Sequence, residues 1–264
     1  MVNKPVIVVA AVVLVAGAGV ALYLHSRHAH LPSVPVAAQP AAPAPSEPAI
    51  EHPVPPVSGD SGPKGPIPAL GDSDPAMIEA LGAVAGGATI AHYLIPDNII
   101  RHIVVTIDNL PRQKVPVDKR PTVALGGTFL AQGDELHGTL EPKNFARYDA
   151  MVAVIRKLDM QQLAAVYLHF YPLFQRVYQD LGYPNGYFND RLVQVIDSLL
   201  ATPQPAGPIE LTRPNVMYTF ADPSLEARPA GQKLLLRMGP DNASAIKAKL
   251  SELRSIVTAT PPKH

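Results

Sequence analysis

The densest group of side chains that could do chemistry lies between Tyr167 and Arg191. It holds eight aromatic residues, whereas the whole chain has 9 tyrosines and 6 phenylalanines. Tyrosine rings stack on sugars or apolar ligands, and Asn, Asp and Arg fix a ligand's orientation. The segment ends in a polar loop that indicates a binding patch, and its candidate residues are Tyr183, Asn185, Tyr187, Asn189, Asp190 and Arg191.

A structural interpretation explains the same loop without a ligand. The aromatic rings pack a core, and Asn185-Gly186 forms a turn between two helices with a positive φ. In this interpretation Asp190 caps the following helix and Arg191 pairs with a nearby group. Both interpretations remain open from the sequence.

A second polar cluster ends an earlier helix. It contains Asp108 and Arg112, which we add to the candidate binding residues. We expect this cluster to dock against the loop, with Arg112 or Arg101 facing Asp190 by charge attraction.

Known catalytic motifs are absent from the sequence. It contains no GxSxG, no HExxH and no Walker phosphate loop. The acidic residues are scattered, so no pair for acid–base catalysis is marked. His25, His28 and His30 would chelate a metal only weakly, because a flexible segment does not preorganise its ligands. We therefore expect no metal site and no cofactor, and an enzymatic role is not favoured.

Composition excludes further classes of protein. The chain has 264 residues, with 22 basic and 22 acidic side chains and no cysteine. A neutral chain offers no basic face for nucleic acid, so no nucleic-acid partner is expected. The segment 234–243 resembles half of a helix–hairpin–helix DNA-binding motif, but the second glycine and the basic rim are missing. Without cysteine there is no disulfide framework and no thiolate metal site.

The elements that must position the candidate residues begin with an apolar segment. Residues 5–24 carry no charge, and a helix of that length spans about 30 Å, the thickness of a bilayer's hydrocarbon core. A cleaved signal peptide is the alternative, but its apolar core is shorter. We assign residues 1–30 to a single-pass membrane anchor with short flanks.

The orientation of this anchor in the membrane is inferred from weaker signals in the sequence. Flanking positive charge is nearly balanced, so the loop-charge rule decides little. A short N-terminal head stays easily in the cytoplasm, and a chain without cysteine suits an oxidising compartment. We expect an inner-membrane protein with a cytoplasmic N-terminus and a periplasmic C-terminal domain.

Residues 31–70 form the second region. They contain 12 prolines and few large apolar residues, so they cannot bury enough surface to fold alone. We expect a disordered Pro/Ala-rich linker, which fully extended would reach on the order of 120 Å. It serves either as a stalk or as a passive linker.

The third region, residues 71–264, has the size of one domain. Helix-start signals, helix-stop signals and apolar residues at 3–4 spacing dominate it, so we expect a mainly α fold. The exception is a small β-hairpin that turns at Gly133-Asp134, with further short strands near 209–211 and 216–220. The predicted helices begin near Asp74, Pro96, Asn144, Asp159, Asn189, Pro229 and Asp241.

Several strings resemble one bacterial family. They are LIPDNIIR at 94–101, DNLP at 108–111, FARY at 145–148, YPLFQ at 171–175, GYPNGYFNDR at 182–191 and the segment 234–243. The chain is similar to the domain-of-unknown-function family 3014 over nearly all of residues 68–257. The resemblance implies a membrane-anchored protein of Gram-negative bacteria and carries no activity or catalytic residue.

Two functions fit these observations. The first is an anchored helical domain that binds an envelope protein or a cell-wall ligand, and we favour it. The alternative is a cell-wall (peptidoglycan) enzyme with an unmarked active site. A closed loop without a cleft favours protein contact, whereas a groove with a buried carboxylate favours the enzyme. Energy transduction of the TonB type is rejected, because residues 5–24 contain no ionisable group.

Overall fold

The computed structural model describes residues 49–56, 62–134, 137–214 and 217–259. The predicted membrane segment, residues 5–24, lies outside these ranges. Among the described residues, no helix is both long enough and apolar enough to cross a membrane.

The domain begins with a helical layer formed by α2 (Asp74–Ala85), α3 (Gly87–Tyr93) and α4 (Ile99–Asn109), after a short 3₁₀ turn η1 (Leu70–Asp72). No side chain caps α2, because Ser73 turns its hydroxyl back to the Leu70 carbonyl. Asp74 instead caps a different helix. Its carboxylate accepts hydrogen bonds from the Asn98 and Ile99 amides at 2.7 and 2.9 Å, where α4 begins.

Three helices form the middle of the domain: α5 (Ala146–Ile155), α6 (Met160–Asp180) and α7 (Phe188–Leu200), with α5 preceded by the 3₁₀ turn η3 (Pro142–Asn144). The predicted start of α6 is confirmed, because the Asp159 carboxylate accepts hydrogen bonds from the Gln161 and Gln162 amides. Pro172 lies inside α6.

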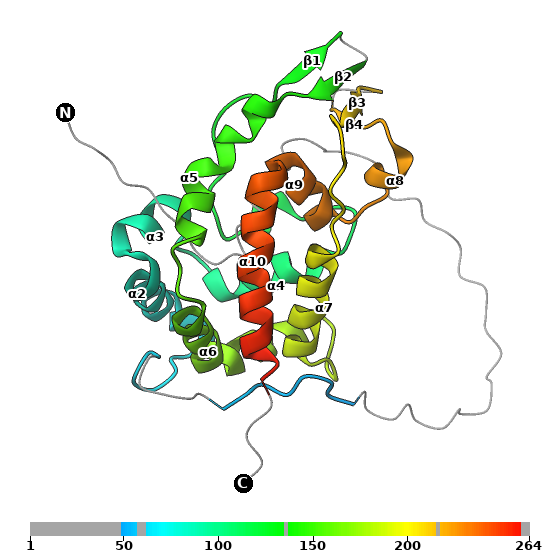
Figure 1. Ribbon diagram of the computed structural model, residues 1–264. Coiled ribbons are helices and arrows are strands. Elements are labelled where there is room, and N and C mark those ends of the chain that lie inside the picture. Colours follow the sequence, from blue (N-terminus) through cyan, green and yellow to red (C-terminus); the bar gives the residue numbers. More distant parts are fainter. Residues whose placement is uncertain (1–48, 57–61, 135–136, 215–216, 260–264) are drawn as a thin grey trace, which may run out of the picture.

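The chain closes with α8 (Pro223–Glu226), α9 (Ala230–Met238) and α10 (Pro240–Val257). Gly239 joins α9 to α10 with φ of 84°, in the region that favours glycine. Helix α10 packs against α5, α6, α7 and α9, and Figure 1 shows it running through the middle of the molecule.

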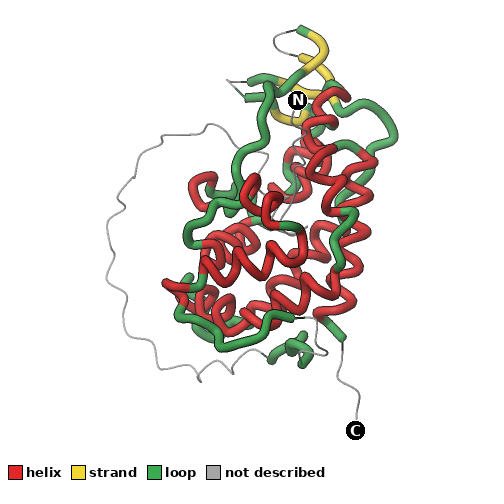
Figure 2. Tube along the Cα trace, turned by 90° about the vertical axis from the view of Figure 1, so that its left-hand side faces the viewer, coloured by secondary structure: helices red, strands yellow, loops and turns green. Residues whose placement is uncertain are grey.

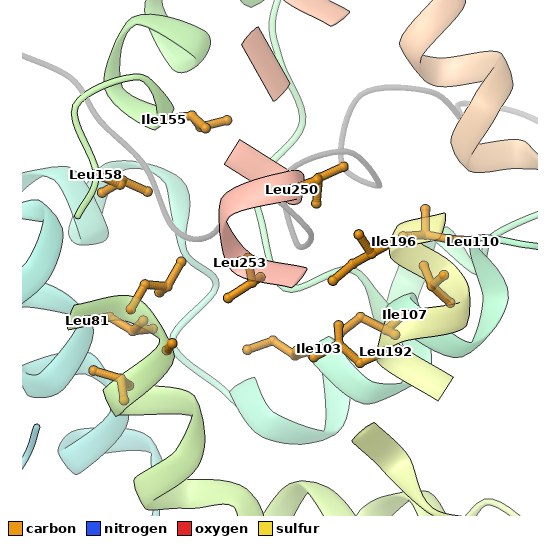
Figure 3. Close-up of a cluster of buried hydrophobic side chains, with 14 of the residues drawn as sticks. Leu81, Ile103, Ile107, Leu110, Ile155, Leu158, Leu192, Ile196, Leu250 and Leu253 are labelled. Carbon is orange, nitrogen blue, oxygen red and sulfur yellow. The ribbon is translucent and has the colours of Figure 1, made fainter. Parts of the chain in front are cut away.

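One main core unites these helices. The apolar faces of α2, α4, α5, α6, α7 and α10 meet in a cluster of buried side chains (Figure 3). Its fully buried members include Met77, Ile99, Ile100, Leu110, Ile155, Phe170, Phe188, Ile196 and Leu199. The 3–4 spacing of apolar residues that predicted the helices therefore also marks the faces that are buried.

A small sheet lies at one end of the helical body, as Figure 2 shows. Its strands are β1 (Ala131–Gly133), β2 (His137–Leu140), β3 (Glu210–Thr212) and β4 (Thr219–Phe220), in that order and all antiparallel. The predicted hairpin is present, but β3 and β4 extend it into one sheet. The cause is a second core of Leu140, Leu211, Phe220 and Leu236, which sheet and α9 bury together.

Part of the predicted linker lies on the domain. Residues 49–56, which we call the strap, cross the ends of α7 and α10 and are drawn in blue in Figure 1. Val54 packs against the main core. The expected disorder is therefore wrong for the strap, because hydrogen bonds and burial offset its ordering entropy. Residues 31–48 and 57–61 of the predicted linker lie outside the described residues.

Candidate functional site

The loop between α6 and α7 carries most of the candidate binding residues. It leaves α6 at Gly182, whose φ is 106°. Gln175 of α6 then holds the loop from below: its Nε2 donates to the Gly186 carbonyl at 2.7 Å, and its Oε1 accepts from the Phe188 amide at 2.8 Å. One amide side chain thus replaces the backbone partners that an irregular loop lacks.

The role expected of Gly186 was wrong. Its φ is not positive, and neither is that of Asn185. The glycine is required by space instead, because a Cβ there would lie 2.8 Å from the Tyr178 ring and 2.9 Å from the Tyr183 Cβ. The loop is therefore packed tightly onto its own aromatic side chains.

The aromatic residues divide between core and surface. Phe188 is fully buried and stacks on Phe174 with ring centroids 5.8 Å apart. Tyr178 and Tyr183 stack at 4.6 Å, and Tyr183 and Tyr187 are only partly buried. The structural interpretation holds for the buried Phe188, whereas the ligand-binding interpretation of Tyr183 and Tyr187 stays a prediction.

Asp108 connects the second polar cluster to the loop. Its carboxylate accepts hydrogen bonds from Arg191 Nε at 3.1 Å, from Arg112 Nη2 at 2.7 Å and from the Tyr183 hydroxyl at 3.3 Å. Arg112 also donates to the Tyr183 hydroxyl at 2.8 Å. The expected docking of cluster and loop is observed, but Asp190 takes no part in it. Asp108 attracts Arg112, which raises the pKa of that guanidinium.

Asp190 faces the strap. Its carboxylate accepts hydrogen bonds from the Glu51 amide at 3.1 Å and from the His52 amide at 2.6 Å. The sequence predicted a cap of α7 at Asn189 or Asp190. Neither residue caps the helix, because it begins earlier, at Phe188. Both side chains are thereby in the first turn and free to reach across to another segment.

Two neighbours of Asp190 complete the contact with the strap. The buried Asn189 donates from Nδ2 to the carbonyls of His52 and Val257, and its Oδ1 accepts from the Tyr167 hydroxyl. The Tyr187 hydroxyl accepts from the Val54 amide at 3.0 Å. Tyr187, Asn189 and Asp190, which we call the polar row, thus contact the strap through its main chain.

Burial sets the ionisation of the phenols behind the polar row. Desolvation raises the pKa of Tyr167 well above its ordinary value, and it raises the pKa of Tyr171 in the same way. Both hydroxyls therefore stay protonated at neutral pH. The Tyr167 hydroxyl donates to Asn189, and the Tyr171 hydroxyl donates to Gln175.

A cavity of about 400 Å³ lies between the strap and the loop. Asn185 is exposed at its rim, while Asn189 is buried beneath it and Arg112 only touches residues of its wall. The residues lining it are Ala49, Glu51, Asp108, Tyr178, Tyr183, Asn185, Gly186, Tyr187, Asp190, Arg191 and Gln194. Six of the eight candidate residues therefore line one cavity.

Some residues of the site had no signal in a local pattern. Gln175 faces the loop from α6, and Gln194 accepts from Arg191 at 2.6 Å. The position of Gln175 four residues after Tyr171, on the same helix face, was the only available hint. Glu51 and His52 could not be found, because they lie about 138 residues from their partner in the sequence.

Metal binding is not supported by the described residues. Within them, no three histidine or acidic side chains come together as a possible metal site. The site can hold polar or extended ligands by hydrogen bonds, stacking and charge.

Fold and site together define a helical domain with a polar, tyrosine-lined cavity beside a bound segment of its own chain. Residues 99–254 match the family described as "Protein of unknown function (DUF3014)", and the chain belongs to that family. No curated protein and no solved structure matches the chain. The matched region contains Asp108 and the loop but not the strap.

Proposed function

We propose that this chain is a single-pass inner-membrane protein whose periplasmic helical domain binds an extended segment of an envelope partner protein. The uncharged residues 5–24 support the anchor, and the proline-rich residues that follow support a long reach. The absence of cysteine supports the oxidising compartment.

One observation carries the binding role: the polar row holds residues 51–54 by main-chain hydrogen bonds. The Glu51, His52 and Val54 amides donate to it, and the His52 carbonyl accepts from it. Main-chain hydrogen bonds supply affinity for an extended chain whatever its sequence, and neighbouring pockets supply specificity. The same row therefore suits a partner's segment that replaces the strap.

The composition of the strap indicates what that segment resembles. Pro53, Pro55 and Pro56 fix φ and favour an extended conformation, so less entropy is lost on binding. Proline-rich peptides commonly dock on aromatic-lined grooves. The cavity walls formed by Tyr178, Tyr183 and Tyr187 offer such a surface next to the strap.

The enzyme alternative would use this cavity's carboxylates. Asp108 is buried, which is the feature expected of an enzyme, but its oxygens accept from Arg191, Arg112 and Tyr183. Asp190 is occupied by two strap amides. Glycoside hydrolysis needs one carboxyl group to give a proton and another to act on the sugar or water. Both groups serve in hydrogen-bond networks instead, so binding is the better supported function.

The test is photo-crosslinking of the full chain in intact cells. A photoreactive phenylalanine analogue replaces the exposed Asn185 at the cavity rim, and mass spectrometry identifies the adducts. We expect adducts with a distinct partner protein, reduced about tenfold or more by Asp190→Ala, because a hydrogen bond to a charged group is lost. Asp180→Ala, which removes an exposed carboxylate at the end of α6, serves as the control.

A second variant separates strap from partner. Replacing residues 51–54 by Gly-Ser-Gly-Ser removes a competitor of the partner's segment, so adduct yield should rise. Adducts that are unchanged in Asp190→Ala, or that form only with peptidoglycan fragments, would contradict binding of a protein segment.

A further inference from the structure

A second cavity, separate from the tyrosine-lined one, lies where the sheet meets α9 and α10. Its volume is about 430 Å³, within the range of about 300–1,000 Å³ that is usual for small-molecule sites. Its described lining residues all differ from those of the tyrosine-lined cavity. The segment 202–209, which leads into β3, forms one wall, and the start of α10 forms another.

The walls are mostly hydrocarbon. Leu140, Phe145, Ile209, Leu235 and Leu236 contribute apolar side chains. Five prolines also line the cavity: Pro142, Pro203, Pro205, Pro208 and Pro240. Proline has no backbone N–H, so these five positions cannot donate main-chain hydrogen bonds to an extended peptide. The cavity therefore suits a hydrocarbon chain better than a peptide strand.

One cation is present in this apolar setting. Among the described residues that line the cavity, Lys247 of α10 is the only charged one, and none is Asp or Glu. Its Nζ donates to the Thr202 carbonyl, which leaves two of its three protons for other acceptors. Desolvation by burial lowers the pKa of Lys247, because burial disfavours the charged form.

Lys249, on the same helix, differs from Lys247 because it has a carboxylate partner. It donates to the Leu158 carbonyl at 3.1 Å and pairs with Glu252 at 2.8 Å, outside the cavity. A partly desolvated cation that has no carboxylate beside it is energetically unfavourable unless an anion binds to it. Within the described part of the chain, Lys247 thus lacks the carboxylate on the cavity wall that would compensate its charge, as Glu252 does for Lys249.

We propose that this cavity binds an amphiphile with a hydrocarbon chain and a single anionic head group. The chain lies along the proline wall and Leu235, and the head group pairs with Lys247. A free fatty acid and an anionic membrane lipid share this chemistry. Either occupant fills the apolar space and neutralises the partly buried cation at once.

The test uses decanoate with a photoreactive diazirine near the end of its chain, added to the full chain in nanodiscs of zwitterionic lipid. Labelled peptides are mapped by mass spectrometry. We expect labels within 203–209 and 235–243, and protection by excess unlabelled decanoate. Decyltrimethylammonium, which has the same chain and a positive head group, should protect about tenfold less, because the charge-assisted hydrogen bond is absent.

Two variants test the assignment of the head group. Lys247→Gln should reduce protected labelling about tenfold, whereas Lys249→Gln should leave it unchanged. Nanodiscs of anionic phosphatidylglycerol distinguish the two sources: they compete with the probe if a membrane lipid is the occupant, and they do not if it is a free acid. Equal protection by anionic and cationic amphiphiles, or labelling that decanoate cannot prevent, would overturn the proposal. These last two outcomes are measured on the wild-type chain, so they do not depend on the stability of a variant.

Discussion

Asp108 shows how a single residue organises the tyrosine-lined cavity. It lies in the last turn of α4, where the helix dipole disfavours a negative charge, and its side chain is only 5% exposed. Arg191 and Arg112 compensate that charge from the loop side and from the residues after α4. The contact ties α4 to α7, so the position of the loop depends on it.

We predict that Asp108→Ala lowers the free energy of unfolding by about 3 kcal/mol, because it leaves the Arg191 guanidinium, 17% exposed, without its partner. Urea unfolding of the full chain measures the change. The control is Asp197→Ala, which breaks an exposed pair with Arg254 and should change the free energy by less than about 1 kcal/mol. Equal losses in the two variants would contradict a buried, organising ion pair.

Two glycines with positive φ allow a matched comparison. Gly182 has φ of 106°, and a Cβ added there would have nothing within 4 Å, whereas at Gly239 an added Cβ would lie 2.5 Å from the Phe145 ring. We predict that Gly182→Ala lowers the free energy of unfolding by about 1 kcal/mol through backbone strain alone. Gly239→Ala should lower it by about 3 kcal/mol or more, because ring displacement adds to the strain. Thermal and urea unfolding compare them, and similar losses would show that the Phe145 contact is unimportant.

Among the elements, α4 begins by an unusual arrangement. Its N-cap residue, Asn98, has a left-handed conformation and makes no side-chain cap. The carboxylate of Asp74, at the start of α2, binds the first free amides of α4 instead. Because one helix caps another, the angle between α2 and α4 is set by hydrogen bonds as well as by packing.

We predict that Asp74→Ala lowers the free energy of unfolding by about 1 kcal/mol, the usual effect of losing an N-cap. Asp72→Ala, which removes a nearby exposed carboxylate, should stay within about 0.5 kcal/mol of the wild type. Urea unfolding measures both variants. If Asp72→Ala is as damaging as Asp74→Ala, general charge near α4 rather than capping explains the effect.

At the scale of the whole molecule, the strap joins the N-terminal part of the described chain to the ends of α7 and α10. It lies on α7 and α10 through Asp190 and Asn189, while the sheet lies at the opposite end of the helical body (Figure 1). The two cavities are therefore separate, and a ligand in one does not touch the other. Under the proposed function, the strap is the segment that a partner replaces, because it is held by main-chain hydrogen bonds.

We predict that Asp190→Ala speeds amide hydrogen exchange at Glu51 and His52 by about tenfold or more, because the carboxylate that accepts both amides is lost. Hydrogen-exchange mass spectrometry of the peptide covering 49–56 reports these amides with few others, since three of its residues are prolines without an N–H. Asp180→Ala should leave the exchange rate unchanged. Fast exchange already present in the wild-type chain would show that the strap is not held by Asp190.

Local chemistry alone determined much of the fold. Helix starts and stops such as Asp159, Gly182 and Gly239 follow from capping and from positive φ, which depend on a few neighbouring residues. The apolar spacing identified the buried faces, and the Gly133-Asp134 turn identified the hairpin. The same local information selected the eight candidate residues, six of which line one cavity in the structure.

Only the tertiary structure decided which residues meet. Asp190 was expected to cap its own helix or to face Arg112, but it binds a segment 138 residues earlier. Helix α2 begins at Asp74, as predicted, but the carboxylate of Asp74 caps α4. Periodicity specifies which side of a helix is buried, whereas the partner of a polar side chain depends on how the helices pack. The sequence by itself therefore determined the elements and their apolar faces, and packing decided the strap, the second cavity and every long-range polar contact.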